Sequence, residues 1–276
     1  MIFMKKDDKP GSEAANKKRP INPKLMKALD FIIPVAAVVV IGTASFNLYK
    51  IYSGYHQAGS EYDELSENAQ VITSGTDENG DQVQIPELDV DFEALEAINS
   101  DLAGWFYMPV LDISYPVAQT DNNDYYLHHT FDKTENSSGS LFLDYESAAD
   151  MTDRNTFLFG HNMKNGSMFG SLKKLRKDES LCDTNPYFFF YTKDKTYCYR
   201  IFAYYITTAN SDTYYNFYSN EHYDDYIDRV MKLNEYKFGS EEDLSGRGNI
   251  MTLSTCSGRH TNYRLVVHGI MVDKIE

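Results

Sequence analysis

Cys256 is the residue of this sequence whose type and position best suit nucleophilic chemistry. It ends the strand-like run IMTLSTC, and the turn SGRHTN separates it from a second strand-like run that contains Arg264. A thiol enzyme needs a cysteine, a base that takes its proton and a positive donor near the carbonyl oxygen that becomes negative. If the two runs pair as a hairpin, the Cβ atoms of Arg264 and Cys256 lie about 5 Å apart. The pattern therefore predicts a thiol and a guanidinium at one strand end.

The other two cysteines have surroundings that are typical of structural thiols. Cys182 lies in a polar, loop-like stretch, and Cys198 lies between aromatic residues in a strand-like run, where a small buried thiol is the usual role. Period-two alternation places Ser254 on the same face as Cys256. We therefore expect Cys256 to be the catalytic thiol and the Ser254 hydroxyl to line the same groove.

His161 is the best-placed candidate for the base among seven histidines. It follows the apolar run NTFLF and Gly160, and we expect this glycine to let the backbone turn sharply and project the imidazole from a strand end. His260, in the turn after Cys256, remains an alternative. His268 is four residues along the strand from Arg264, or about 13 Å, which is too far.

The composition excludes several classes of protein. The 276 residues carry 41 acidic and 26 basic side chains, a net charge of −15. Such a charge repels phosphate backbones, and the second half of the chain has no basic patch, so nucleic acid is not an expected partner. Three cysteines cannot form a disulfide scaffold, and no cysteine or histidine cluster has zinc-site spacing. We expect neither a metal nor a cofactor.

Residues 31–49 form an uncharged, mostly apolar run of nineteen residues, and a helix of that length spans about 30 Å, the thickness of a bilayer core. Residues 1–30 carry eight Lys or Arg and four acids (8 − 4 = +4), whereas residues 51–99 carry twelve acids and no Lys or Arg. The positive-inside rule then predicts a cytoplasmic N-terminus. A cleaved signal peptide and a buried helix are the alternatives, but the run exceeds a signal-peptide core of about 7–15 residues and lacks a polar face.

These patterns predict four parts of the chain. Residues 1–30 are a basic cytoplasmic tail, 31–49 a transmembrane signal anchor, 50–85 an acidic extracytoplasmic linker that forms a solvated stalk, and 86–276 the catalytic domain.

Within the catalytic domain, strands outnumber helices. Apolar residues spaced three and four apart predict a leading helix soon after Pro86, and short apolar or alternating runs predict strands from Tyr107 onward. Only 168–177 and 222–233 look helical later in the chain. Many short strands with few helices indicate a mostly β fold, a closed or nearly closed barrel with helical insertions.

Several motifs resemble the sortases, the membrane-anchored transpeptidases of Gram-positive bacteria. Three of them occur in the family's order: FGHNM at 159–163, TLSTC at 252–256 and RLVVHG at 264–269. Features similar to class B in particular are the leading helix, a helix-sized insertion before the cysteine strand, YPVAQTDNNDYYLHH at 115–129 and GSLFLD at 139–144. The similarity runs from about Pro86 to the end of the chain.

The resemblance implies an eight-stranded sortase β-barrel with an N-terminal helix and a helical insertion before the catalytic cysteine strand. It implies that His161, Cys256 and Arg264 are the catalytic residues, with Arg259 in the intervening turn as the alternative arginine. It also implies that several segments line a groove for the substrate peptide: Asn123, Leu127, Ser254, Thr255 and the segment 207–218.

The activity that the resemblance implies is cleavage of a C-terminal sorting signal after Thr. Cys256 would form a thioacyl intermediate, His161 would protonate the leaving amine, Arg264 would hold the oxyanion, and a peptidoglycan precursor amine would take the acyl group. The expected partners are surface proteins that bear such a signal, the peptidoglycan amine acceptor and the membrane.

Three alternatives remain open. One is an extracytoplasmic Cys/His cell-wall peptidase of papain type, in which Cys normally precedes His, against the order seen here. The others are a class B-like sortase that assembles pili, and a membrane-tethered binding module without activity.

Overall fold

The computed structural model describes residues 23–73, 85–215, 217, 219–236, 244–256 and 262–275. The chain divides into two compact units, residues 1–50 and 51–276. In the described part of the first unit the chain is helical and belongs to α1 (Pro23–Ser66), which contains the predicted run 31–49. Among the described helices, α1 alone is long and apolar enough to cross a membrane, and its apolar window is fully exposed. It is a candidate membrane anchor.

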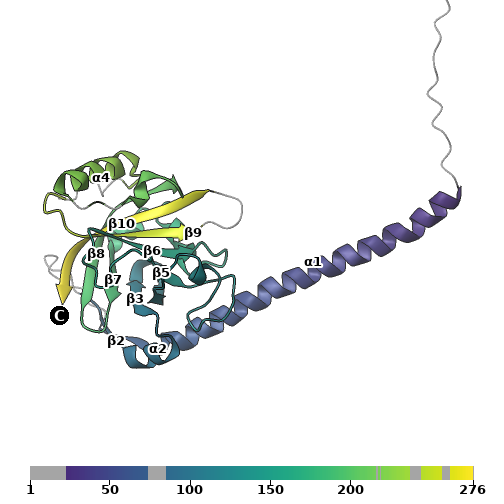
Figure 1. Ribbon diagram of the computed structural model, residues 1–276, viewed down its shortest axis with the longest axis horizontal. Helices are drawn as coiled ribbons and strands as arrows, with labels where there is room; N and C mark the ends of the chain where they lie inside the picture. Colours follow the sequence, from purple (N-terminus) through teal and green to yellow (C-terminus); the bar gives the residue numbers. More distant parts are fainter. Residues whose placement is uncertain are drawn as a thin grey trace, which may run out of the picture. The chain divides into compact units, whose positions relative to one another are not determined.

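The second unit is built on a closed barrel of eight strands, in the spatial order β10-β8-β7-β3-β4-β5-β6-β9 (Figure 1). The pairs β4–β5 and β6–β9 are parallel, and the other neighbouring pairs are antiparallel. The barrel strands are β3 (Leu102–Met108), β4 (Ile113–Ala118), β5 (Leu141–Leu143), β6 (Asn155–His161), β7 (Tyr187–Tyr191), β8 (Thr196–Thr208), β9 (Ile250–Cys256) and β10 (Tyr263–Ile275). This architecture confirms the predicted mostly β barrel.

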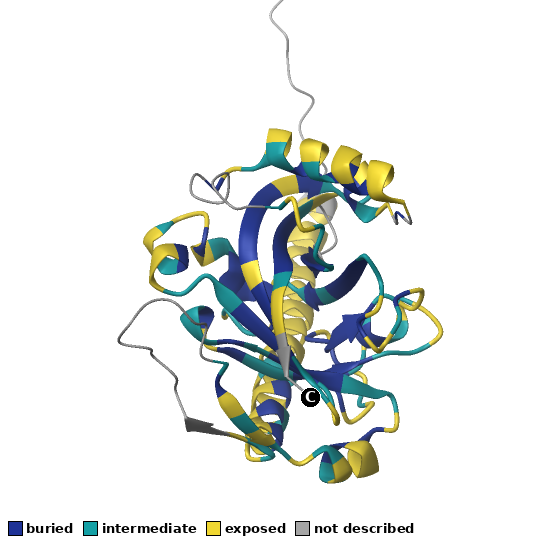
Figure 2. Ribbon diagram, turned by 90° about the vertical axis from the view of Figure 1, so that its left-hand side faces the viewer, coloured by how far each residue is buried: buried dark blue, intermediate teal, exposed yellow. Residues whose placement is uncertain are grey.

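Helices occupy the connections between strands. The expected leading helix is α2 (Phe92–Ile98), whose first turn is capped by the Asp91 carboxylate, which accepts a hydrogen bond of 2.9 Å from the Ala94 amide. The expected insertion helix is α4 (Asn220–Leu233), which lies beside the barrel with one face buried and the other exposed (Figure 2). The remaining helical elements are η1 (Pro109–Leu111), η2 (Tyr125–Leu127), η3 (Phe169–Lys174), α3 (Ser180–Thr184) and η4 (Asp212–Tyr214).

Two helical elements differ from the sequence prediction. The run 168–177 was expected to be helical, and the structure forms only a six-residue 3₁₀ segment there, η3. Cys182, expected in a loop, lies in the short helix α3. Both segments are short and packed against the barrel, so tertiary contacts rather than local propensity determine their form.

The predicted linker over 50–85 differs from the structure in its first half. There α1 continues to Ser66, and its residues Ala58, Tyr62 and Leu65 are buried. The chain then forms β1 (Ala69–Thr73), which pairs antiparallel with β2 (Glu87–Val90). The folded unit therefore includes residues well before Pro86, and the remainder of the predicted linker, 74–84, lies outside the described residues.

The core divides into two apolar clusters. The larger fills the barrel and includes Trp105, Phe106 and Leu253, all fully buried. The smaller lies between α4 and the strands β8, β9 and β10, and includes Phe202 and Val266. Packing on both sides makes β9 and β10 rigid supports for the residues at their ends.

Candidate active site

Strand β9 brings the three predicted catalytic positions together at one end of the barrel. It pairs in parallel with β6, and in that ladder His161 and Cys256 are direct Cα partners. On its other side it pairs antiparallel with β10, with Val266 opposite Ser254. Arg264 lies two residues before Val266 on β10, so it is near the same end of the sheet as Cys256. The antiparallel pairing expected from the sequence therefore forms, and the strand of Cys256 lies between the strands of His161 and Arg264.

Gly160 supports His161 by close packing and not by a turn. The residue lies within β6, opposite Thr255, so the sharp turn expected from the sequence is absent. A Cβ atom at this position would clash with Leu141 Cδ2 and lie 2.9 Å from the ring of Phe169. Glycine is thus required here because two barrel side chains occupy the space beside the backbone.

The imidazole of His161 is held by the backbone of the β4–β5 loop (residues 119–140). Its Nε2 lies 2.7 Å from the carbonyl oxygen of Leu127. A carbonyl can only accept a hydrogen bond, so Nε2 carries the hydrogen, and Nδ1 is the atom that can take a proton. This contact fixes the orientation of the ring and assigns its tautomer.

The surroundings of His161 favour its neutral form. Burial lowers the pKa of His161 below its usual value, and the positive charges of His128 and Arg264 lower it further, whereas the hydrogen bond to Leu127 raises it. Arg264 is therefore close enough to His161 for its charge to act on the ring. In this structure one guanidinium nitrogen of Arg264 donates to the carbonyl oxygen of Tyr263 at 3.2 Å.

The residues expected to bind substrate occupy different environments. Leu127 is partly buried beside His161, and Asn123 accepts a hydrogen bond of 3.0 Å from the Tyr145 amide. Ser254 is fully buried, and its hydroxyl lies 2.7 Å from the hydroxyl of Tyr214, which belongs to the expected segment 207–218.

Thr255 is buried and faces the hairpin partner strand. Its hydroxyl accepts a hydrogen bond of 3.1 Å from the amide of Leu265 and lies 3.4 Å from the carbonyl oxygen of the same residue. In this conformation the side chain stabilises the pairing of β9 with β10 at the point next to Cys256.

A buried polar network under α4 was not anticipated from the sequence. The Thr252 hydroxyl donates to Asn155 at 2.7 Å and therefore accepts from Nδ1 of His268 at 2.9 Å. Nε2 of His268 is then an acceptor, and the Tyr205 hydroxyl lies 3.1 Å from it. Burial lowers the pKa of His268 to about 3. This histidine is a neutral structural group, as its distance along the strand from Arg264 suggested.

Cys182 and Cys198 are buried thiols away from this arrangement. Burial raises the pKa of each to about 12, with a further contribution from nearby carboxylates. The alternative base His260 and the alternative cation Arg259 lie outside the described residues, as does the turn that holds them. In the part of the chain that the structure describes, no group of His, Cys, Asp and Glu side chains is arranged to hold a metal ion.

The closed mixed barrel carries a histidine, a cysteine and an arginine on three adjacent strands, and these are the groups that a thiol enzyme of the acyl-transfer class requires. Residues 106–272 match the family model of the Sortase domain, and the chain belongs to the sortase family. It is similar to Sortase B of Listeria monocytogenes, with 32% identity over 257 residues that cover 90% of this chain and all of that protein.

Solved structures agree with this assignment. Sortase B from Bacillus anthracis in complex with AAEK1 superposes with a TM-score of 0.65 at 30% identity, covering 81% of this chain and 100% of that one. A Staphylococcus aureus sortase B–substrate complex gives a TM-score of 0.62 at 28% identity, covering 66% of this chain and 84% of that one. The chain is a class B sortase, and its activity is that of a cysteine transpeptidase.

Proposed function

We propose that this transpeptidase cleaves a C-terminal sorting signal after Thr and joins the released carbonyl to an amine of a peptidoglycan precursor. The observation that carries the proposal is the pairing of β9 with β6 and with β10, because His161 is the direct partner of Cys256 and Arg264 lies on the neighbouring strand. The family likeness supplies the substrate class, and the aligned residues supply the groups that the chemistry requires.

The reaction divides between the thiol and the imidazole. His161 takes the proton of the Cys256 thiol, and the resulting thiolate attacks the carbonyl carbon of the Thr residue, so that a C–S bond forms as the peptide C–N bond breaks. His161 gives a proton to the departing amine, and it later takes one from the incoming amine as that amine breaks the thioester. Because the pKa of His161 is lowered, the ring is neutral before the reaction and is a stronger acid than an ordinary imidazolium once it is protonated.

Arg264 is proposed to stabilise the negative oxygen of the two tetrahedral intermediates. Its place on β10, the strand beside the one that carries Cys256, and its electrostatic effect on His161 support this role.

The proposed substrate groove runs over the β4–β5 loop and the connection that follows β8. Asn123 and Leu127 are the proposed direct contacts, because neither is fully buried. Ser254 and Thr255 are also proposed to belong to the groove. Because both are buried, we assign Ser254 an indirect contact through Tyr214 and Thr255 a supporting role in the hairpin.

The proposed arrangement of the chain in the cell has the N-terminus in the cytoplasm and the catalytic unit outside. The basic residues 1–30 and the acidic residues 51–99 on opposite sides of the apolar run support it. A protease added to intact protoplasts should digest the catalytic unit and leave the tail. Complete protection of the catalytic unit would contradict this orientation.

A peptide library assay with and without an added amine tests the activity. A library of C-terminal sorting peptides is incubated with the enzyme, and products are identified by mass spectrometry. Cleavage after Thr, with a shift from hydrolysed to aminated product as amine is added, is the expected result. Hydrolysis that no amine diverts would indicate a Cys/His peptidase, and absence of any cleavage would indicate a binding module.

A further inference from the structure

We propose that Tyr62 is a positioning residue for His161, on which it acts through the β4–β5 loop. The proposal rests on the function proposed above for His161. Tyr62 lies on the part of α1 that packs against the barrel, and its ring is buried edge-on against Tyr115, with the ring centroids 5.2 Å apart. Because burial raises the pKa of Tyr62, its hydroxyl stays protonated and can donate.

The Tyr62 hydroxyl is bonded to the end of the β4–β5 loop. It donates to the carbonyl oxygen of Gly139 at 2.8 Å and lies 3.0 Å from the hydroxyl of Ser140. The Ser140 hydroxyl donates to the carbonyl oxygen of His129 at 3.1 Å, and the Ser140 amide donates to that of Tyr126 at 3.0 Å. A single buried hydroxyl on α1 therefore fixes the point where both ends of the 126–140 segment meet.

That point is in contact with the catalytic imidazole. Gly139 has a positive φ of 58°, and a Cβ atom there would lie 2.9 Å from Cδ2 of His161 and 2.5 Å from the carbonyl oxygen of Tyr126. The next residue after Tyr126 is Leu127, whose carbonyl oxygen holds Nε2 of His161. Movement of Gly139 would thus disturb both the surface against which the ring packs and its hydrogen-bond acceptor.

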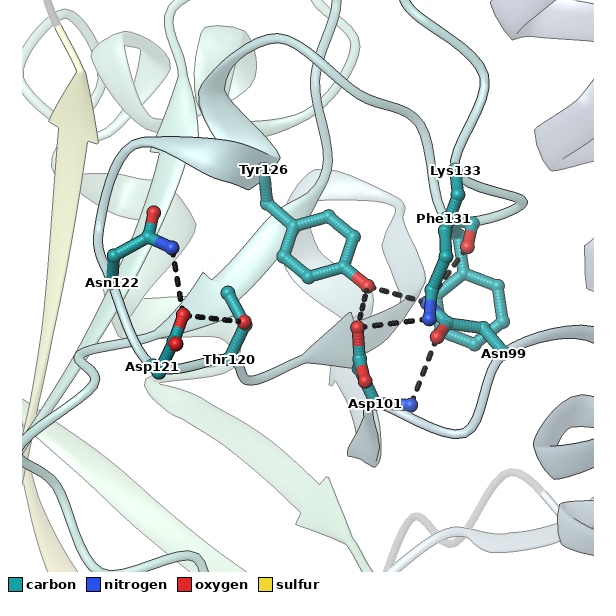
Figure 3. A network of polar contacts seen from close by, with 8 residues as sticks. All are labelled: Asn99, Asp101, Thr120, Asp121, Asn122, Tyr126, Phe131 and Lys133. Atoms are coloured by element: carbon teal, nitrogen blue, oxygen red, sulfur yellow. Dashed lines mark hydrogen bonds and ion pairs between the residues drawn. The ribbon is translucent and has the colours of Figure 1, made fainter.

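The loop is held on its other side by a separate network, so Tyr62 supplies a distinct constraint. The Tyr126 hydroxyl donates to Asp101 at 2.7 Å and accepts from Asn99 at 2.8 Å, and Lys133 forms an ion pair with Asp101 at 3.0 Å (Figure 3). This network holds the loop to the start of β3. Among the described contacts, the side-chain hydrogen bonds of this network do not reach Gly139, so the bond from Tyr62 is an additional constraint.

Two further contacts join α1 to the same loop, but they are more exposed. The Asn136 side chain donates to the carbonyl oxygen of Gly54 at 2.9 Å, and the Asp132 amide donates to Glu61 at 3.0 Å. Exposed or partly exposed hydrogen bonds compete with water and constrain less than a buried one. Among the described contacts from α1 to the loop, the hydrogen bond of Tyr62 to Gly139 is the one that is buried and lies next to His161.

Tyr62→Phe tests the proposal, because it removes the hydroxyl and retains the ring. With a sorting peptide as substrate, kcat should fall about tenfold with KM nearly unchanged, since a small misplacement of a catalytic group reduces rate more than binding. The pKa of His161, measured by NMR titration, should also fall, because a looser Leu127 hydrogen bond no longer raises it. Tyr55→Phe, two turns earlier on α1, is the matched control and should leave both quantities unchanged.

The proposal would be overturned if Tyr62→Phe kept the wild-type kcat and the wild-type pKa of His161. Tyr62 would then be a purely structural residue, even if the variant had a lower melting temperature. If Tyr62→Phe does not fold, Ser140→Ala is the second test. A lower kcat and a lower pKa of His161 in this variant support the proposal, and wild-type values of both overturn it. His161→Ala separates this question from the proposed function. Full activity in His161→Ala would reject the role of His161 itself, whatever Tyr62→Phe does.

Discussion

His161 and Cys256 are direct partners in the parallel ladder between β6 and β9. Backbone hydrogen bonds set this relationship, and neighbouring strands lie about 4.8 Å apart. The side chains are not needed to hold the two positions together. Replacement of either side chain should therefore remove chemistry without moving the other residue, which makes the site suited to single substitutions.

The pKa of His161 should lie below 6.5 and should depend on Arg264. Burial and the two nearby positive charges all favour the neutral ring. Removing the Arg264 charge in Arg264→Gln should raise the pKa of His161, and His128→Gln should raise it as well. NMR titration of the free enzyme measures this, with His222→Gln as a control that leaves the value unchanged. A pKa at or above 6.5, or one that Arg264→Gln leaves unchanged, would contradict the electrostatics of the site.

Arg264→Lys should lower kcat about 10²-fold, or about 2.7 kcal/mol, with little change in KM. Lysine retains the positive charge but loses the planar fork of donors that fits an oxyanion. Steady-state kinetics on a sorting peptide provide the measurement. Arg259→Lys is the control: a large kcat loss there with none at Arg264 would assign the oxyanion to the other arginine, and a rise in KM alone would assign Arg264 to substrate binding.

Cys182 and Cys198 should be dispensable for activity. Burial raises the pKa of each thiol to about 12, so both stay protonated and unreactive near neutral pH. Cys182→Ala and Cys198→Ala should each keep the activity of the wild type, whereas Cys256→Ala should be inactive. Loss of activity in either of the first two, with the variant still folded by circular dichroism, would count against this assignment.

His268 should make the folded state sensitive to acid. Its pKa is about 3 in the folded protein but near 6.5 in the unfolded chain, so below pH 6.5 the unfolded chain binds a proton that the folded protein does not. The free energy of unfolding that His268 contributes is therefore fully present above pH 6.5. It is lost as the pH falls toward 3, by up to about 1.4 kcal/mol for each pH unit. Urea unfolding at pH 7, 6 and 5 should show a shallower loss in His268→Gln than in the wild type. Parallel losses in the two proteins would rule out this source of acid sensitivity.

The sequence predicted the barrel because each strand-like run can be recognised from neighbouring residues. It indicated the candidate catalytic positions because they lie in short motifs. Cys256 and Arg264 lie on either side of one short turn, so pairing as a hairpin follows from proximity. The parallel pairing of His161 with Cys256 joins strands far apart in the chain, and the sequence did not predict it, although both residues were selected from it as candidates at strand ends.

The extension of α1 to Ser66 was missed because the acidic composition after residue 50 favoured a solvated linker. A signal was nevertheless present: Tyr55, Ala58, Tyr62 and Leu65 are spaced three, four and three residues apart, which is typical of one helix face. All four are buried or packed against the core. Gly160 was expected from the sequence to allow a sharp turn, but its role in the structure is to leave space for Leu141 and Phe169. This role was missed because these side chains meet Gly160 only in the folded barrel.

Mass spectrometry of the products from one sorting peptide, one amine acceptor and two enzymes tests the central claim most directly. The wild type should cleave the peptide after Thr, pass through an acyl adduct on Cys256 and yield the aminated product. Cys256→Ala, in which the backbone pairing with His161 is retained, should yield none. Aminated product from Cys256→Ala, or an acyl adduct on another residue of the wild type, would contradict the assignment of the reaction to His161, Cys256 and Arg264.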